Sequence, residues 1–141
     1  MIILDTNIVS ALMLAEPTPE VISWMDKVNE ELLWMTAISV YEIQFGINLL
    51  PEGRKKKLLS QHFDEMLRYD YRNRIIEFDV NAALAAGEVN AVQKRSGKNC
   101  DTRDVQIAGI ALARGACLAT RNVKDFEFEG LKVINPFASN F

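Results

Sequence analysis

The chain has 141 residues, of which 49% are hydrophobic and 25% are charged, and its formal net charge is −3. This length suits one ordinary domain with a full core, and the composition is typical of a folded soluble protein. The negative charge excludes a protein that coats nucleic acid through a general positive field, because phosphate affinity scales with Lys and Arg contacts.

The sequence gives no sign of a membrane segment or of a disulfide framework. No apolar run is long enough to span a bilayer, and the N-terminus lacks the pattern of a secretory signal peptide. We therefore expect a cytoplasmic protein. Two cysteines, Cys100 and Cys117, are too few for a disulfide framework or a zinc knuckle, so we expect them to be reduced packing residues.

The first seven residues, MIILDTN, predict a buried strand that is followed at once by polar side chains. Ile2 to Leu4 form a continuous apolar run, which is typical of a parallel strand covered on both faces. Asp5, Thr6 and Asn7 would then lie at the carboxyl end of the strand, where open α/β sheets place their ligands. Asp5 or Thr6 could equally be the N-cap of the next helix, and these residues alone leave both interpretations open.

Strands and helices alternate along the rest of the chain. We predict further strands at 32–36, 75–78, 116–120 and 131–134. We predict helices at 8–14, 19–29, 39–50, 54–69, 80–96 and 101–114, and a loop with room for one helical turn at 121–130. The alternation indicates one α/β domain, residues 1–141, built on a mainly parallel sheet of five strands.

Acids and amides stand at the start of a helix or just after a strand at four places: Asp5, Glu42, the pair Asp101 and Asp104, and Asn122 with Asp125. Each has a structural alternative. Ser39 and Glu42 match a capping box, Asp101 can be an N-cap, and Asp104 can be a first-turn acid favoured by the helix dipole. Asn122 and Asp125 can be ordinary loop residues.

These acids follow different strands of the predicted sheet, and parallel strands end at the same edge. Carboxylates brought together there would raise one another's pKa, and a hard cation would relieve the conflict. Mg²⁺ or Mn²⁺ fits because both prefer oxygen ligands. The sequence contains neither a Cys and His cluster for zinc nor a Gly-rich phosphate loop, and its one histidine, His62, lies in a charged helix. The pattern indicates metal and phosphate chemistry.

Four segments resemble the PIN-domain ribonucleases, specifically the VapC-like toxins of type II toxin–antitoxin pairs and their FitB-like subgroup. The segments are LDTN at 4–7, TAISVYE at 36–42, DTRDVQIAGIALARG at 101–115 and LATRNVKDF at 118–126. They occur in the family's order and spacing over nearly the whole chain. The resemblance implies a three-layer α/β/α sandwich.

Carried over to this chain, the resemblance makes Asp5, Glu42 and Asp104 the metal-binding and catalytic acids. Asn122 replaces a fourth acid that many members have, and it stays open whether Asp101, Asn122 or Asp125 completes the site. Four polar residues are expected to orient the carboxylates through hydrogen bonds: Thr6, Asn7, Ser39 and Thr120.

The resemblance implies a metal-dependent endoribonuclease in which water attacks a phosphodiester of RNA. It also implies a homodimer, inhibition by a cognate VapB-like antitoxin, and contact with operator DNA only through that antitoxin. The alternative is a catalytically silent, toxin-like subunit of an antitoxin–DNA repressor complex. A phosphohydrolase of the haloacid dehalogenase type also begins with a strand and an Asp, but that class requires a second Asp where this chain has Asn7.

Three basic clusters could contact RNA phosphates, or could equally be the solvated faces of helices. They are residues 54–57, the pair Arg72 and Arg74, and the group Lys94, Arg95 and Lys98.

Overall fold

A parallel sheet of five strands forms the centre of the computed structural model, which describes residues 1–14 and 16–138. The strand order is β3-β2-β1-β4-β5, and all four neighbouring pairs are parallel. The strands are β1 (Ile2–Leu4), β2 (Leu33–Thr36), β3 (Ile75–Ile76), β4 (Cys117–Ala119) and β5 (Val133–Ile134). The predicted parallel sheet is confirmed. The predicted domain of residues 1–141 also includes residues 15 and 139–141, which lie outside the described residues.

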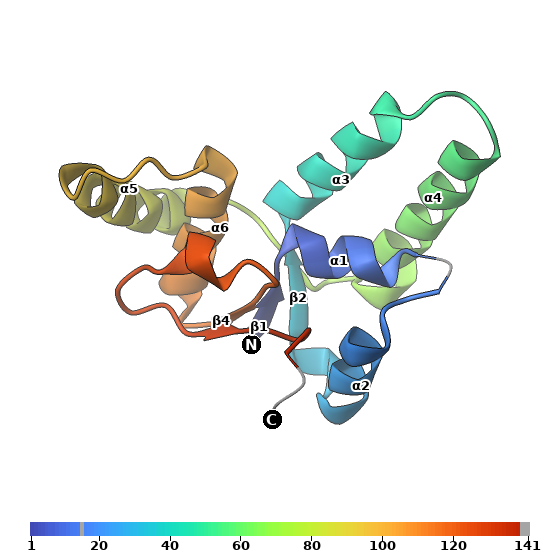
Figure 1. Ribbon diagram of the computed structural model, residues 1–141, viewed down its shortest axis with the longest axis horizontal. Helices are drawn as coiled ribbons and strands as arrows, with labels where there is room; N and C mark the ends of the chain where they lie inside the picture. Colours follow the sequence, from blue (N-terminus) through green and yellow to red (C-terminus); the bar gives the residue numbers. More distant parts are fainter. Residues whose placement is uncertain (15, 139–141) are drawn as a thin grey trace.

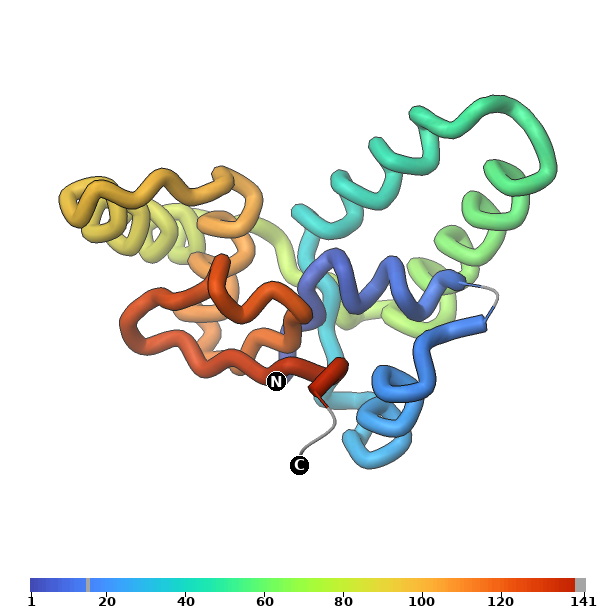
Figure 2. The backbone as a smooth tube through the Cα atoms, in the orientation of Figure 1, coloured from blue at the N-terminus to red at the C-terminus, as the bar shows by residue number. Residues whose placement is uncertain are grey.

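Helices cover both faces of the sheet, as Figure 1 shows. They are α1 (Thr6–Leu12), α2 (Pro19–Lys27), α3 (Ala37–Leu49), α4 (Arg54–Glu65), α5 (Val80–Arg95) and α6 (Thr102–Arg114). The first four lie on one side of the strands and α5 and α6 on the other, so the predicted three-layer sandwich is confirmed. In Figure 2, α3 and α4 form a hairpin that extends away from the sheet. Among the described helices, none is long and apolar enough to cross a membrane.

Short strands supply two separate cores because successive side chains point to opposite faces of the sheet. Leu4 and Met35 pack among α1, α2, α3 and α4, whereas Ile3 and Leu118 pack among α5 and α6. All four side chains are fully buried. This burial on both faces explains why the strands are continuous apolar runs in the sequence.

Several predicted boundaries differ from the structure by a few residues. The helix predicted at 39–50 begins at Ala37, because Thr36 caps it: the Thr36 hydroxyl accepts the backbone N–H of Ser39 at 3.1 Å. Ser39 is therefore the third helical residue, and the capping box with Glu42 is wrong. The helix predicted at 54–69 is α4 followed by the π-helical turn Met66–Asp70.

Two short 3-10 turns lie next to strands, one before β2 and one after β4, and the second agrees with the predicted helical turn. The 3-10 turn Glu30–Leu32 precedes β2 and takes the first residue of the predicted strand at 32–36. The turn Val123–Phe126 lies within 121–130, where one helical turn was expected.

The contact between α5 and α6 depends on small side chains. A Cβ atom at Gly109 would lie 2.5 Å from the carbonyl oxygen of Ala82 and 2.7 Å from the Cβ of Ala86. Both alanines are buried in the core beneath α5 and α6. The alanines of the predicted helix at 80–96 thus allow α6 to approach closely, and α6 carries Asp104 to the edge of the sheet.

Gly109→Ala is expected to destabilise the protein by about 1–3 kcal/mol, because the new methyl group has to displace the α5 backbone. Gly87→Ala on α5 is the matched control, since no atom lies within 4 Å of a Cβ there. We expect this control to be neutral or to stabilise the helix by up to about 1 kcal/mol. Urea unfolding of both variants measures the difference, and equal stability of Gly109→Ala and wild type would contradict the close approach.

Candidate active site

Asp5 occupies the carboxyl end of the central strand β1 and is 5% exposed. One of its oxygens accepts the backbone N–H of Thr6 at 2.8 Å, so Asp5 is the N-cap of α1. The other accepts the Thr120 hydroxyl at 2.7 Å and the Asn7 amide at 3.1 Å. Asp5 thus lies at the carboxyl end of the strand and also caps the next helix, and its role as a ligand stays a prediction.

The pKa of Asp5 is raised, first by its burial and further by the charges of Glu42 and Asp125, while the hydrogen bonds from Thr120 and Thr6 lower it. Neutral hydrogen-bond donors stabilise the buried carboxylate but leave its negative charge in place. Asp5 is thus a buried acid in a negative environment.

Thr120, which follows β4, joins the loop after this strand to α1. Its hydroxyl oxygen accepts the Asn7 amide at 3.3 Å and the backbone N–H of Asn122 at 3.0 Å, in addition to its bond with Asp5. The side-chain oxygen of Asn7 accepts the backbone N–H of Arg121 at 3.2 Å. These contacts fix the orientation of the Asp5 carboxylate.

Glu42 reaches the same region from α3. Its Oε1 accepts the hydroxyl of Thr6 at 2.9 Å, and that hydroxyl lies 2.8 Å from the Oγ of buried Ser39. Its Oε2 lies 3.4 Å from Nη1 of Arg103. Arg103 went unnoticed in the sequence, because an ion pair between residues so far apart leaves no local pattern.

Asp101 and Asp104 begin α6, and they differ in environment. Asp101 is exposed and is the N-cap of α6: it accepts the backbone N–H of Arg103 at 2.8 Å and forms an ion pair with its guanidinium at 3.3 Å. The hydrogen bond from Arg103 lowers the pKa of Asp101. Burial raises the pKa of Asp104 to about 7, and the charges of Asp5, Asp101, Asp125 and Glu42 add to the rise.

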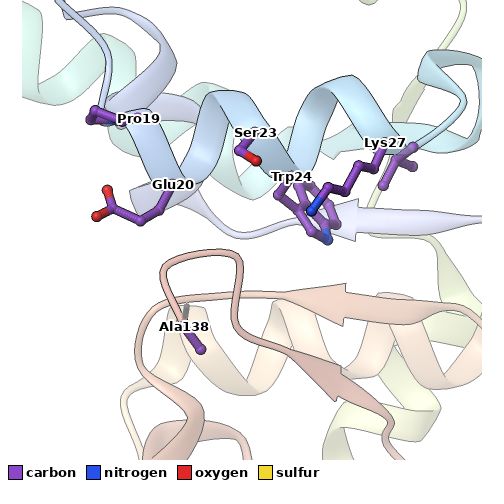
Figure 3. A pocket seen from close by; sticks show the side chains of 7 residues that line it. Pro19, Glu20, Ser23, Trp24, Lys27 and Ala138 are labelled. Carbon is purple, nitrogen blue, oxygen red and sulfur yellow. The ribbon is translucent and has the colours of Figure 1, made fainter. Parts of the chain in front are cut away.

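One cavity of about 490 Å³ brings three of the predicted acids together. Its lining includes Asp5, Thr6, Asn7, Glu42, Asp104, Arg121 and Asn122. Asp101 and Asp125 line a neighbouring cavity of about 540 Å³ that shares Asp104 with the first. A third cavity of about 530 Å³, between α2 and Ala138, has no lining residue in common with the acidic one (Figure 3).

The donor set fits a hard divalent cation in its chemistry, because carboxylates line one cavity, and burial together with neighbouring like charges raises the pKa of Asp104. Within residues 1–14 and 16–138, no group of three His, Cys, Asp or Glu side chains is close enough to hold a metal ion. Both oxygens of Glu42 already have partners in Thr6 and Arg103.

Two of the predicted basic clusters contain residues with different surroundings in the structure. Arg74 donates to the backbone carbonyls of Glu30, Leu33 and Asp70 and thereby holds loops together. Lys98 lines the cavity that contains Asp101, Asp104 and Asp125. Lys124, which belongs to none of the predicted basic clusters, lines the same cavity. His62 has its Nδ1 3.5 Å from the Met13 carbonyl oxygen, away from the acids.

Comparison with known proteins identifies the family. The sequence model of one protein family, described as "PIN domain", matches residues 2–128. The chain therefore belongs to the PIN-domain family. The chain is 38% identical to plasmid stability protein StbB of Pseudomonas syringae pv. tomato, covering 97% of this chain and 99% of that protein. It is 36% identical to VapC ribonuclease Y4jK of Sinorhizobium fredii (97% and 98% covered) and 31% identical to toxin FitB of Neisseria gonorrhoeae (97% and 99% covered).

A solved structure of FitAB bound to an IR36 DNA fragment superposes with a TM-score of 0.90 at 30% identity, covering 100% of this chain and 99% of that one. The predicted resemblance to VapC-like and FitB-like proteins is thus confirmed.

Asp104→Asn is expected to raise the free energy of unfolding of the metal-free protein at pH 8 by roughly 1–3 kcal/mol. The pKa of Asp104 is raised from 3.8 to about 7, so the folded state holds its proton more tightly than the unfolded state between these pH values. Wild-type stability therefore falls as the pH rises through this window, and the neutral amide removes that loss.

Urea unfolding in the presence of a chelator, at pH 4 and at pH 8, measures this effect. The advantage of Asp104→Asn should disappear at pH 4, and Asp64→Asn on the exposed face of α4 serves as the control acid. An advantage of the same size at both pH values would contradict the assigned cause.

Proposed function

We propose that this chain is a metal-dependent endoribonuclease toxin that cleaves RNA by attack of water on a phosphodiester. The observation that carries the proposal is the convergence of Asp5, Glu42 and Asp104, from three separate elements, on one cavity. The names of relatives, VapC ribonuclease and toxin FitB, support the same function.

Asp5, Glu42 and Asp104 would hold Mg²⁺ or Mn²⁺, which when bound activates water and offsets negative charge at phosphorus. Thr120 and Asn7 hold the Asp5 carboxylate in place, and Thr6 holds Glu42. Cleavage would break the bond between phosphorus and the 3′-oxygen, leaving a 5′-phosphate and a 3′-hydroxyl.

Burial and the neighbouring acids raise the pKa of Asp104 to about 7 in the metal-free protein, and a bound cation would favour its anionic form. Cations near the acids would contact the RNA backbone. Arg121 lines the acidic cavity, and Lys98 and Lys124 line the neighbouring one. Because the two cavities share Asp104, a single strand lying across this residue would meet positive charges on both sides of the cut.

The toxin assignment includes a cognate VapB-like antitoxin as inhibitor, contact with operator DNA only through that antitoxin, and a homodimer. The solved structure of FitAB bound to a DNA fragment supports the pairing with an antitoxin and the contact with DNA. An exposed apolar row on α3 supports a protein partner here: Tyr41, Phe45 and Leu49 are 59%, 49% and 70% exposed, and the Tyr41 and Phe45 rings stack at 6.1 Å.

Asp5→Asn and Asp104→Asn are each expected to reduce Mg²⁺-dependent cleavage of single-stranded RNA by about 100-fold or more, because each removes an anionic ligand from the proposed ion. Both substitutions keep the size of the side chain. Asp64→Asn on α4, an exposed acid in an ion pair with Arg68, is the matched control and should cut at the wild-type rate.

The measurement is the initial rate on an end-labelled RNA, with thermal unfolding to show that each variant is folded. A folded Asp5→Asn or Asp104→Asn protein that cuts at the wild-type rate would overturn the assignment. A wild-type protein that cuts no RNA with Mg²⁺ or Mn²⁺ would favour the catalytically silent repressor subunit.

A further inference from the structure

Arg103 stands between two carboxylates, Glu42, which lines the acidic cavity, and Asp101, which lines the neighbouring one. Its Nη1 lies 3.4 Å from Oε2 of Glu42, and its Nη2 lies 3.3 Å from Oδ2 of Asp101. The Arg103 side chain is 48% exposed and that of Glu42 is 20% exposed. Arg103 thus contacts an acid from α3 across the site while its other contact is the cap of its own helix.

Both oxygens of Glu42 have a partner in the metal-free protein. Oε1 of Glu42 accepts the Thr6 hydroxyl, and Oε2 faces the guanidinium of Arg103. A neutral hydroxyl can stay bonded to a carboxylate that also binds a metal ion, as outer partners of metal ligands commonly do. A guanidinium cannot share the same oxygen with a divalent cation without strong repulsion between the two positive charges.

We propose that Arg103 is a positioning residue that holds Glu42 in the metal-free protein and competes with the divalent cation for this carboxylate. The inference rests on the proposed function, because it assumes that the cation binds between Asp5, Glu42 and Asp104. Arg103 thereby sets the concentration of metal ion at which the site becomes loaded. It also accounts for three acids that line one cavity without standing at metal-binding distance within the described residues.

Asp101 keeps Arg103 at the site after Glu42 is released. Its carboxylate accepts both the backbone N–H and the guanidinium of Arg103, so the arginine has a second partner at the start of α6. Because the ion pair is partly exposed, its effect on affinity is modest, about fivefold.

The test is the dissociation constant of Mn²⁺, measured by isothermal titration calorimetry on the full chain without RNA. Arg103→Gln is expected to bind Mn²⁺ about fivefold more tightly than wild type. Arg103→Lys keeps the positive charge beside Glu42 and should return the affinity toward the wild-type value. Thermal unfolding without metal serves to show that the variants are folded.

Two controls separate competition for Glu42 from a general loss of positive charge. Arg121→Gln removes a cation that lines the acidic cavity and lies over the Phe137 ring at 3.6 Å without an ion pair to Glu42, so it should change Mn²⁺ affinity less than Arg103→Gln. In a Glu42→Gln background, Arg103→Gln should no longer tighten Mn²⁺ binding, because the carboxylate for which Arg103 and Mn²⁺ compete is gone.

The outcomes distinguish this inference from the proposed function. Equal effects of Arg103→Gln and Arg121→Gln, or an undiminished effect of Arg103→Gln in the Glu42→Gln background, would overturn the competition while leaving metal-dependent cleavage intact. A wild-type protein that binds no Mn²⁺, together with an Arg103→Gln protein that binds none, would overturn both.

Discussion

The site depends on one buried carboxylate at the end of the central strand. Asp5 is held by the Thr6 backbone, the Thr120 hydroxyl and the Asn7 amide, which tie β1 to α1 and to the loop after β4. All three donors are neutral, so they satisfy the hydrogen-bonding capacity of the acid without cancelling its charge. The fold therefore keeps a negative charge at the sheet edge that only a positive partner can balance.

The parallel sheet concentrates this charge further. Strands that run in one direction bring the start of α3 and the start of α6 to the edge where Asp5 lies, and these helices carry Glu42 and Asp104. Burial, and after it repulsion from the neighbouring acids, raises the pKa of Asp104 to about 7. In the metal-free protein Arg103 meets part of this charge by pairing with Glu42. The clustered acids thus lower the stability of the metal-free folded state, and a cation bound between them would raise it.

The sequence predicted most of this architecture for identifiable reasons. Short apolar runs marked the strands because both faces of the sheet are buried, and polar residues directly after the runs marked the edge. Ser39 and Glu42 imitate a capping box and so predict a later start for α3, whereas Thr36 provides the cap. Arg103 and Lys124 went unnoticed because their positions beside Glu42 and Asp104 arise only from the folding of distant segments.

The central claim is that Asp5 and Asp104 share a divalent cation at this edge. Crystals grown with Mn²⁺ and measured near its absorption edge test it most directly, because anomalous scattering locates manganese without reference to a model. We expect an anomalous peak in the acidic cavity, within coordinating distance of carboxylate oxygens from both residues. A protein that cleaves RNA with Mn²⁺ but shows its only manganese peak elsewhere would rule out this shared site.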